Sequence, residues 1–101
     1  MLLQWSEAAL KDRDEVFDYI AADRPGSAIE MDLRIRNECR TLLRLPQAGR
    51  NGRVHGTREL VIQHSPYIAA YRVNAGTVQI LRVLHGARRW PGKFIKKKAS
   101  R

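Results

Sequence analysis

The stretch of residues 55–91 constrains the fold more than any other part of the chain, because it predicts three consecutive antiparallel strands. Residues 60–64 are apolar with one polar break, and Pro66 marks the start or the edge of the next strand, since proline cannot donate to a ladder. Residues 67–73 alternate, whereas residues 77–85 are apolar on nearly both faces, which predicts a strand covered on both sides. One face of the middle strand carries Tyr67, Ala69, Tyr71 and Val73.

The third predicted strand begins after a tight turn and ends in a polar cluster. Residues 74–76 form the turn, in which Gly76 takes the left-handed backbone conformation that a hairpin bulge needs. Within a few residues of the far end of the strand lie a histidine, two arginines and an indole: His85, Arg88, Arg89 and Trp90. If the chain has a working site, we expect it there.

The N-terminal third predicts a short strand followed by a helix. Residues 1–5 favour the strand, and Ser6 is placed to cap the helix, because its hydroxyl can accept from an unpaired N–H of the first turn. Apolar residues recur at helical spacing, which predicts one buried stripe with acids on the opposite side. The expected stripe contains Ala9, Val16 and Ile20, and the expected solvent side contains Asp12, Asp14, Glu15 and Asp18.

A second helix is expected over about residues 27–43, opened by Pro25 or Ser27, with Cys39 on its apolar stripe. Residues 47–56 are polar and glycine-rich and are expected to form a loop without a core element. The order strand, helix, helix, loop and three strands predicts an α+β fold, in which an antiparallel helix hairpin packs on one face of a small sheet that contains the three antiparallel strands. The other face would then be the exposed functional surface.

The chain has 101 residues, which is enough for one small domain. We expect this domain to span residues 1–91 and residues 92–101 to form a basic, flexible tail. A single cysteine excludes an internal disulfide, and three scattered histidines without metal-ligand spacing predict neither a metal site nor a cofactor. No long apolar run or signal-peptide pattern is present, so we expect a soluble, cytoplasmic protein without membrane contact.

Charge is distributed unevenly along the chain. Residues 1–32 carry a net charge of −5 and residues 33–101 carry +14. The basic part predicts a surface for a polyanion, such as nucleic acid, a ribosome or an acidic protein; the alternative is that the charge only keeps a small domain in solution. The candidate target-binding or nucleic-acid-binding residues are Arg50, Arg53, Arg58, Arg82, Arg88 and Arg89.

Five motifs in the same order resemble the RelE/ParE superfamily of toxins, which belong to bacterial type II toxin–antitoxin modules, also called plasmid stabilisation systems. The resemblance covers residues 2–91 and agrees with the α+β fold expected above. The motifs are Trp5 before an alanine-rich helix, Pro46-x-x-Gly49-Arg50, GTREL at residues 56–60, PYIxxYRV at residues 66–73 and ILRVLHGAR at residues 80–88.

The resemblance implies a growth-arresting toxin that a cognate antitoxin neutralises by folding a disordered, amphipathic segment around it. Operator DNA would be bound only indirectly, through the antitoxin. The ParE branch poisons DNA gyrase without known catalytic residues, whereas the RelE branch cuts mRNA on the 70S ribosome. Candidate antitoxin contacts are Tyr67, Tyr71 and Trp90, although both tyrosines also fit a core position and Trp90 also fits a clamp on the C-terminal segment.

The sequence departs from the RelE pattern at Ile68, where RelE-like enzymes tend to carry an arginine. The ending over residues 82–88 is more similar to the ParE branch. A gyrase inhibitor is therefore the first hypothesis and a ribosome-dependent endoribonuclease is the alternative; a third possibility is a plain nucleic-acid-binding module with neither activity. In the alternative, the catalytic set would be His85, Arg58, Arg88 and Arg89, which combine a group that titrates near neutral pH with phosphate-binding guanidinium groups. His85 is equally compatible with a structural bond to nearby backbone, and Arg58 with an ion pair to Glu59 or to the helix acids.

Overall fold

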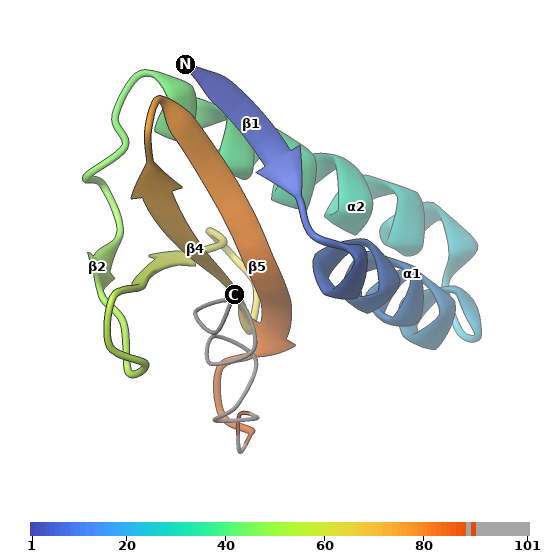
Figure 1. Ribbon diagram of the computed structural model, residues 1–101. Helices are drawn as coiled ribbons and strands as arrows, with labels where there is room; N and C mark the ends of the chain where they lie inside the picture. Colours follow the sequence, from blue (N-terminus) through green and yellow to red (C-terminus); the bar gives the residue numbers. More distant parts are fainter. Residues whose placement is uncertain (89, 91–101) are drawn as a thin grey trace.

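The computed structural model describes residues 1–88 and residue 90. A helix pair lies against a five-stranded sheet of order β1-β5-β4-β3-β2 (Figure 1), which confirms the α+β fold. The predictions for Arg89 and for residues 92–101 concern positions outside the described residues. The elements are β1 (Leu2–Trp5), α1 (Glu7–Ala21), α2 (Pro25–Arg40), the 3-10 turn η1 (Thr41–Leu43), β2 (Arg50–Asn51), β3 (Arg58–Val61), β4 (Tyr67–Asn74) and β5 (Thr77–His85).

The longest strand, β5, lies second in the sheet order and has different neighbours along its two edges. It pairs with β4 in the antiparallel sense along its whole length, whereas β1 pairs with it in the parallel sense and only opposite residues 77–80. The β1 ladder stops there because the chain turns at Ser6 into α1, whose first turn is capped by the Ser6 hydroxyl as predicted. On this edge, the second half of β5 therefore lies beside α1 instead of beside β1 (Figure 1).

Two of the expected elements need correction. Residues 47–56 do contain a strand, since Arg50–Asn51 pairs with residues 58–59 of β3 at the edge of the sheet. A two-residue strand has too few side chains to produce an alternating pattern, so composition could not reveal it. The second helix begins at Pro25, the earlier of the two predicted starts, and the α-helix ends at Arg40. The chain continues to Leu43 only as a 3-10 turn.

The β4–β5 hairpin differs from the prediction at its turn. Asn74 pairs with Thr77, so the loop contains only Ala75 and Gly76, which have φ of 49° and 79°. Two positive φ angles are typical of a two-residue type I′ turn, which needs no bulge beside it. The irregularity lies further along the ladder: Ala70 faces Arg82 and the next residue, Tyr71, faces Ile80. The extra residue in β5 at this point is Leu81.

Both faces of the sheet are covered near its centre. The predicted core face of β4 packs under the helices, where Ala69 and Tyr71 are fully buried with Val78 and Ile80 of β5. On the opposite face, the exposed fractions of Ile68, Ala70 and Leu81 are only 6%, 1% and 3%. The prediction that β5 is covered on both sides is confirmed. The second face is consequently not the open functional surface that the sequence suggested.

Candidate partner-binding groove

A groove of about 730 Å³ runs between α1 and the half of β5 that β1 does not cover. Its helix wall is formed by Asp12, Glu15, Val16 and Tyr19. Its sheet wall is formed by residues 82–85 of β5, by Pro66 and Tyr67 at the start of β4, and by Arg88 and Trp90 beyond the strand. The groove therefore lies at the strand end where the sequence predicted a working site.

Asp12 closes the edge of β5 at the base of this groove. Its carboxylate accepts hydrogen bonds from Arg82 Nε and Nη2 at 2.7 and 2.9 Å, and from the Val83 backbone N–H at 2.9 Å. That N–H points to the edge which β1 no longer reaches, so the carboxylate takes the place of a strand carbonyl. The hydrogen bonds that Arg82 donates to the Asp12 carboxylate raise the pKa of Arg82. Asp12 is 5% exposed, so its expected position on the solvent side of the helix was wrong.

The aromatic floor of the groove is built around Tyr67. The His85 ring meets it edge to face, with 5.9 Å between the ring centroids, and burial raises the pKa of the Tyr67 hydroxyl. His85 Nδ1 accepts a hydrogen bond from the Ala87 N–H at 3.2 Å, and the His85 carbonyl accepts one from Trp90 Nε1 at 3.1 Å. His85 thus makes the structural backbone contacts and also lines the groove. Tyr19, at the rim, is 75% exposed.

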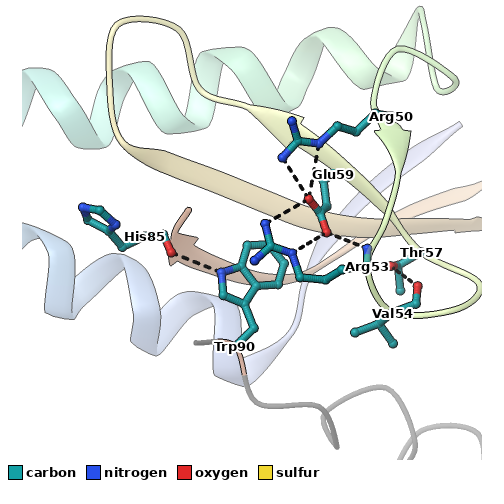
Figure 2. A network of polar contacts seen from close by, with 7 residues as sticks. All are labelled: Arg50, Arg53, Val54, Thr57, Glu59, His85 and Trp90. Atoms are coloured by element: carbon teal, nitrogen blue, oxygen red, sulfur yellow. Dashed lines mark hydrogen bonds and ion pairs between the residues drawn. The ribbon is translucent and has the colours of Figure 1, made fainter. Parts of the chain in front are cut away.

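Glu59 binds two basic side chains, one from β2 and one from the loop that follows β2 (Figure 2). Its carboxylate accepts from Arg50 Nη2 at 3.1 Å, from Arg53 Nε at 3.1 Å and from the Arg53 backbone N–H at 2.7 Å. Burial alone would raise the pKa of Glu59, but the bonds from Arg53 and Arg50 outweigh it and lower the pKa. The Arg53 guanidinium also lies over the Trp90 ring, with its carbon 3.8 Å from the centroid. Arg50 and Arg53 are consequently paired within the chain, although their side chains remain 56% and 40% exposed.

Comparison with known proteins identifies the family. The family model "ParE toxin of type II toxin-antitoxin system, parDE" matches residues 3–90, nearly the whole chain. The chain belongs to the ParE toxin family. It is therefore the toxin of a type II toxin–antitoxin system, which implies an antitoxin as its partner.

Two relatives of this ParE-family toxin align over most of their length, and a solved structure shares its fold. The chain is 39% identical over 89 residues to a protein of Sinorhizobium fredii named "Putative toxin Y4kP", with 88% of this chain and 92% of the relative covered. It is 37% identical over 84 residues to "Toxin RelE2" of Caulobacter vibrioides, with 83% and 93% covered. A solved structure described as "Chromosomal ParDE TA system from P. aeruginosa" matches with a TM-score of 0.78 and 30% identity, covering 84% of this chain and 95% of that one.

The ParE-family fold separates Arg58 from His85 and Arg88, the three residues of the alternative catalytic set that the structure describes. His85 and Arg88 both line the groove. Arg58 faces Tyr71, four residues along β4 from the partner of His85 and on the other side of that strand. Ladder spacings place the Arg58 and His85 Cα atoms roughly 16 Å apart. Arg58 Nη1 donates to the carbonyls of Gly49 at 2.7 Å and Gln47 at 3.4 Å, so the expected ion pair of Arg58 with Glu59 or with the helix acids is not formed.

The three candidate antitoxin contacts have different environments. Tyr67 and Trp90 line the groove. Tyr71 is fully buried; its hydroxyl donates to the Pro46 carbonyl at 2.7 Å and accepts from the Gly49 N–H at 2.9 Å. This tyrosine therefore fastens the loop before β2 to the core and, in this structure, offers no surface to a partner.

Sequence reasoning missed the roles of Asp12 and Glu59. Asp12 lies three residues after buried Ala9 and four before buried Val16, which is the spacing of the core stripe itself. Glu59 is one of only two acids in residues 33–101, surrounded in sequence by arginines, and that isolation was a usable signal. Within the described part of the chain, no helix is long and apolar enough to cross a membrane, and no group of three or more histidine, cysteine or acidic side chains could hold a metal ion.

Proposed function

We propose that this toxin arrests growth in the cytoplasm by inhibiting DNA gyrase through protein–protein contact. The observation that supports the proposal is that most of the candidate guanidinium groups are already bonded to other groups of the same chain. Arg58 is bonded to loop carbonyls, Arg82 to Asp12, and Arg53 to Glu59. Only Arg88, among the described arginines at the strand end, has an exposed side chain that lines the groove.

The chemistry of RNA cleavage argues for the same choice. An endoribonuclease must take a proton from the 2′-hydroxyl, stabilise the negative phosphorane and protonate the 5′-oxygen. Stabilisation of a phosphorane normally requires several cationic groups that converge on one point. Here Arg58 lies at the other end of the sheet, and Ile68, where RelE-like enzymes carry an arginine, is a buried apolar side chain. A mechanism that depends on macromolecular contact makes no such demand.

The alternative is a ribosome-dependent mRNA endoribonuclease, and one observation favours it. His85 and Arg88 lie in the same groove, and the Tyr67 ring meets His85 edge to face. This arrangement would supply one proton-transfer group and one phosphate ligand. The two proposals differ in what these residues do: they would be essential for cleavage, but only part of a larger contact surface for gyrase.

We also propose that the antitoxin occupies the groove between α1 and β5. The groove offers apolar surface from Val16 and Tyr67, an exposed carboxylate from Glu15 on one wall and an exposed guanidinium from Arg88 on the other. A disordered segment that folds on binding can place apolar side chains on the floor and charged ones on both rims. An amphipathic segment with acids toward Arg88 and a base toward Glu15 fits these walls.

Pulse labelling of cells that express the toxin separates the two targets. Incorporation of thymidine and of methionine is followed in parallel from the moment of induction. The gyrase proposal expects DNA synthesis to fall first, with His85→Ala and Arg88→Ala weakening the effect only partly. If protein synthesis collapses first and mRNA is cut in phase with codons, the gyrase proposal is wrong and the endoribonuclease is supported. Loss of neither synthesis would contradict both targets.

A further inference from the structure

Trp90 forms part of the groove wall. One of its two contacts comes from inside the groove and the other from outside it. Its indole N–H donates to the His85 carbonyl at 3.1 Å, which ties the ring to the end of β5. Its ring face receives the Arg53 guanidinium at 3.8 Å (Figure 2). Arg53 comes from the loop that follows β2, a segment that does not line the groove. One aromatic side chain thus connects the groove to the opposite edge of the sheet.

Arg53 is itself fixed by a buried carboxylate. Its Nε and its backbone N–H both donate to Glu59 Oε2, and its Nη2 lies 3.4 Å from Oε1. Glu59 is 3% exposed and belongs to β3, so it is a rigid anchor. A guanidinium whose edge is bonded to a carboxylate still presents its flat face, and that face is the surface which stacks on an aromatic ring. Arg53 therefore holds a defined orientation toward Trp90.

We infer that Arg53, anchored by Glu59, is a positioning residue for the antitoxin: it keeps Trp90 in place as a wall of the groove and touches no part of the bound partner. This inference rests on the proposal that the antitoxin occupies the groove. A side chain that is already immobilised loses little conformational entropy when a partner packs against it, and binding is tighter for that reason. The antitoxin segment that meets Trp90 would present an apolar side chain to the indole.

Arg50 provides a matched control for Arg53. Both arginines pair with the same carboxylate at 3.1 Å, but only Arg53 is stacked on Trp90. Arg50→Ala and Arg53→Ala each remove one ion pair from Glu59, so they separate a general loss of stability from a specific loss of the stacking contact. Thermal unfolding of both variants establishes that each is folded at the temperature of the binding assay.

The contact itself is tested without any partner. Trp5→Phe leaves Trp90 as the only indole of the full chain, and quenching of its fluorescence by acrylamide then reports its accessibility. We expect Arg53→Ala in this background to increase the quenching constant, and Arg50→Ala to leave it unchanged. Equal quenching in the two variants would show that Arg53 does not hold the ring, and the inference would fail at this step.

The effect on binding is tested with the purified antitoxin of the same module by titration calorimetry on the full-length toxin. Loss of a cation–π contact of ordinary strength predicts that Arg53→Ala weakens binding by about three- to tenfold. Because Arg53 acts through Trp90, the double variant Arg53→Ala/Trp90→Ala should bind no more weakly than Trp90→Ala alone. Arg50→Ala should bind like the wild type.

The outcomes distinguish this inference from the proposed function. If Tyr19→Ala, at the groove rim, weakens binding while Arg53→Ala does not, the antitoxin site stands and the positioning role is wrong. Additive losses in Arg53→Ala and Trp90→Ala would likewise overturn it, since they would mean that Arg53 contacts the partner independently. If neither Tyr19→Ala nor Trp90→Ala changes the affinity, the groove is not the antitoxin site and both proposals fail.

Discussion

The carboxylate of Asp12 and the guanidinium of Arg82 form a two-bonded ion pair, at 2.7 and 2.9 Å, at the point where β1 stops covering β5. The pair joins residues 70 positions apart and fixes the distance between α1 and the uncovered half of the strand. That distance is the width of the groove. A surface ion pair contributes little to stability, but here Asp12 is 5% exposed and the side chain of Arg82 only 19% exposed.

Asp12→Ala should destabilise the fold strongly. It leaves the half-buried Arg82 without this carboxylate and the Val83 N–H without its acceptor, which predicts a loss of about 3 kcal/mol in the free energy of unfolding. Urea denaturation followed by circular dichroism measures it. Asp14→Ala is the control, because Asp14 is an exposed acid on the same helix and should change stability by less than about 0.5 kcal/mol. Equal losses in the two variants would contradict the role assigned to Asp12.

Glu59 should make stability depend on pH in a definite direction. Its pKa is lower in the folded protein than the usual value of 4.5, so the unfolded chain binds more protons as the pH falls below that value. Stability from this group is therefore fully present above the unfolded pKa and is lost as the pH falls through the folded pKa. We expect the stability difference between wild type and Glu59→Gln to be largest near pH 7 and to shrink below about pH 4. A difference that stays constant down to pH 2 would show that the carboxylate charge is not what matters.

Local signals in the sequence predicted much of this fold. Ser6 caps α1 because a cap needs only its own first turn, and the alternation in β4 placed Ala69 and Tyr71 in the core because side chains alternate between the faces of any strand. Asp12 was misplaced because helical periodicity treats every acid as solvent-facing. Its partner, Arg82, lies in β5, and no residue of α1 indicates that this partner exists.

The sequence indicated where the candidate site lies, but it did not indicate which arginines line it. The strand end does line a groove, since His85 is the last residue of β5 and Arg88 lies three residues beyond it. The count of arginines, in contrast, says nothing about where each guanidinium points. Arg58 turns toward the carbonyls of Gln47 and Gly49, and Arg53 turns toward Glu59. Long side chains choose their partners in the tertiary fold, so net charge alone overestimated the free basic surface.

Tyr71→Phe should loosen the loop before β2 without disturbing the core. The ring stays buried, but the Gly49 N–H and the Pro46 carbonyl lose the hydroxyl to which they are bonded, which predicts a cost of about 1–2 kcal/mol. In the variant, amide hydrogen exchange at Gly49 should be faster than in the wild type, whereas exchange at Ala69, in the centre of β4, should be unchanged. Tyr19→Phe serves as the control, because that hydroxyl belongs to a side chain 75% exposed. Unchanged exchange at Gly49 would mean that the hydroxyl does not hold the loop.

The thiol of Cys39 should be inert in the folded protein. The side chain is fully buried in α2, and burial raises its pKa to about 12. The thiolate, which is the reactive form, is therefore scarce at pH 8, and reagents cannot reach it. Labelling by a disulfide reagent should be slow in buffer and fast in urea, where the pKa returns to about 8.5. Rapid labelling of the folded chain at pH 8 would show that the region around Cys39 opens locally.

Tyr19 and Leu10 test where the antitoxin binds. Both are exposed side chains on α1, at 75% and 45%, but only Tyr19 lines the groove. Truncation of an exposed aromatic to alanine costs the unbound protein little, so a loss of affinity reports a contact made in the complex. Removing a rim aromatic is expected to cost about 1–2 kcal/mol of binding free energy, or roughly five- to thirtyfold in Kd. Tyr19→Ala should therefore bind the antitoxin more weakly and become harder to neutralise in cells, whereas Leu10→Ala should behave like the wild type. The reverse result would move the interface to the outer side of the helix pair, away from β5.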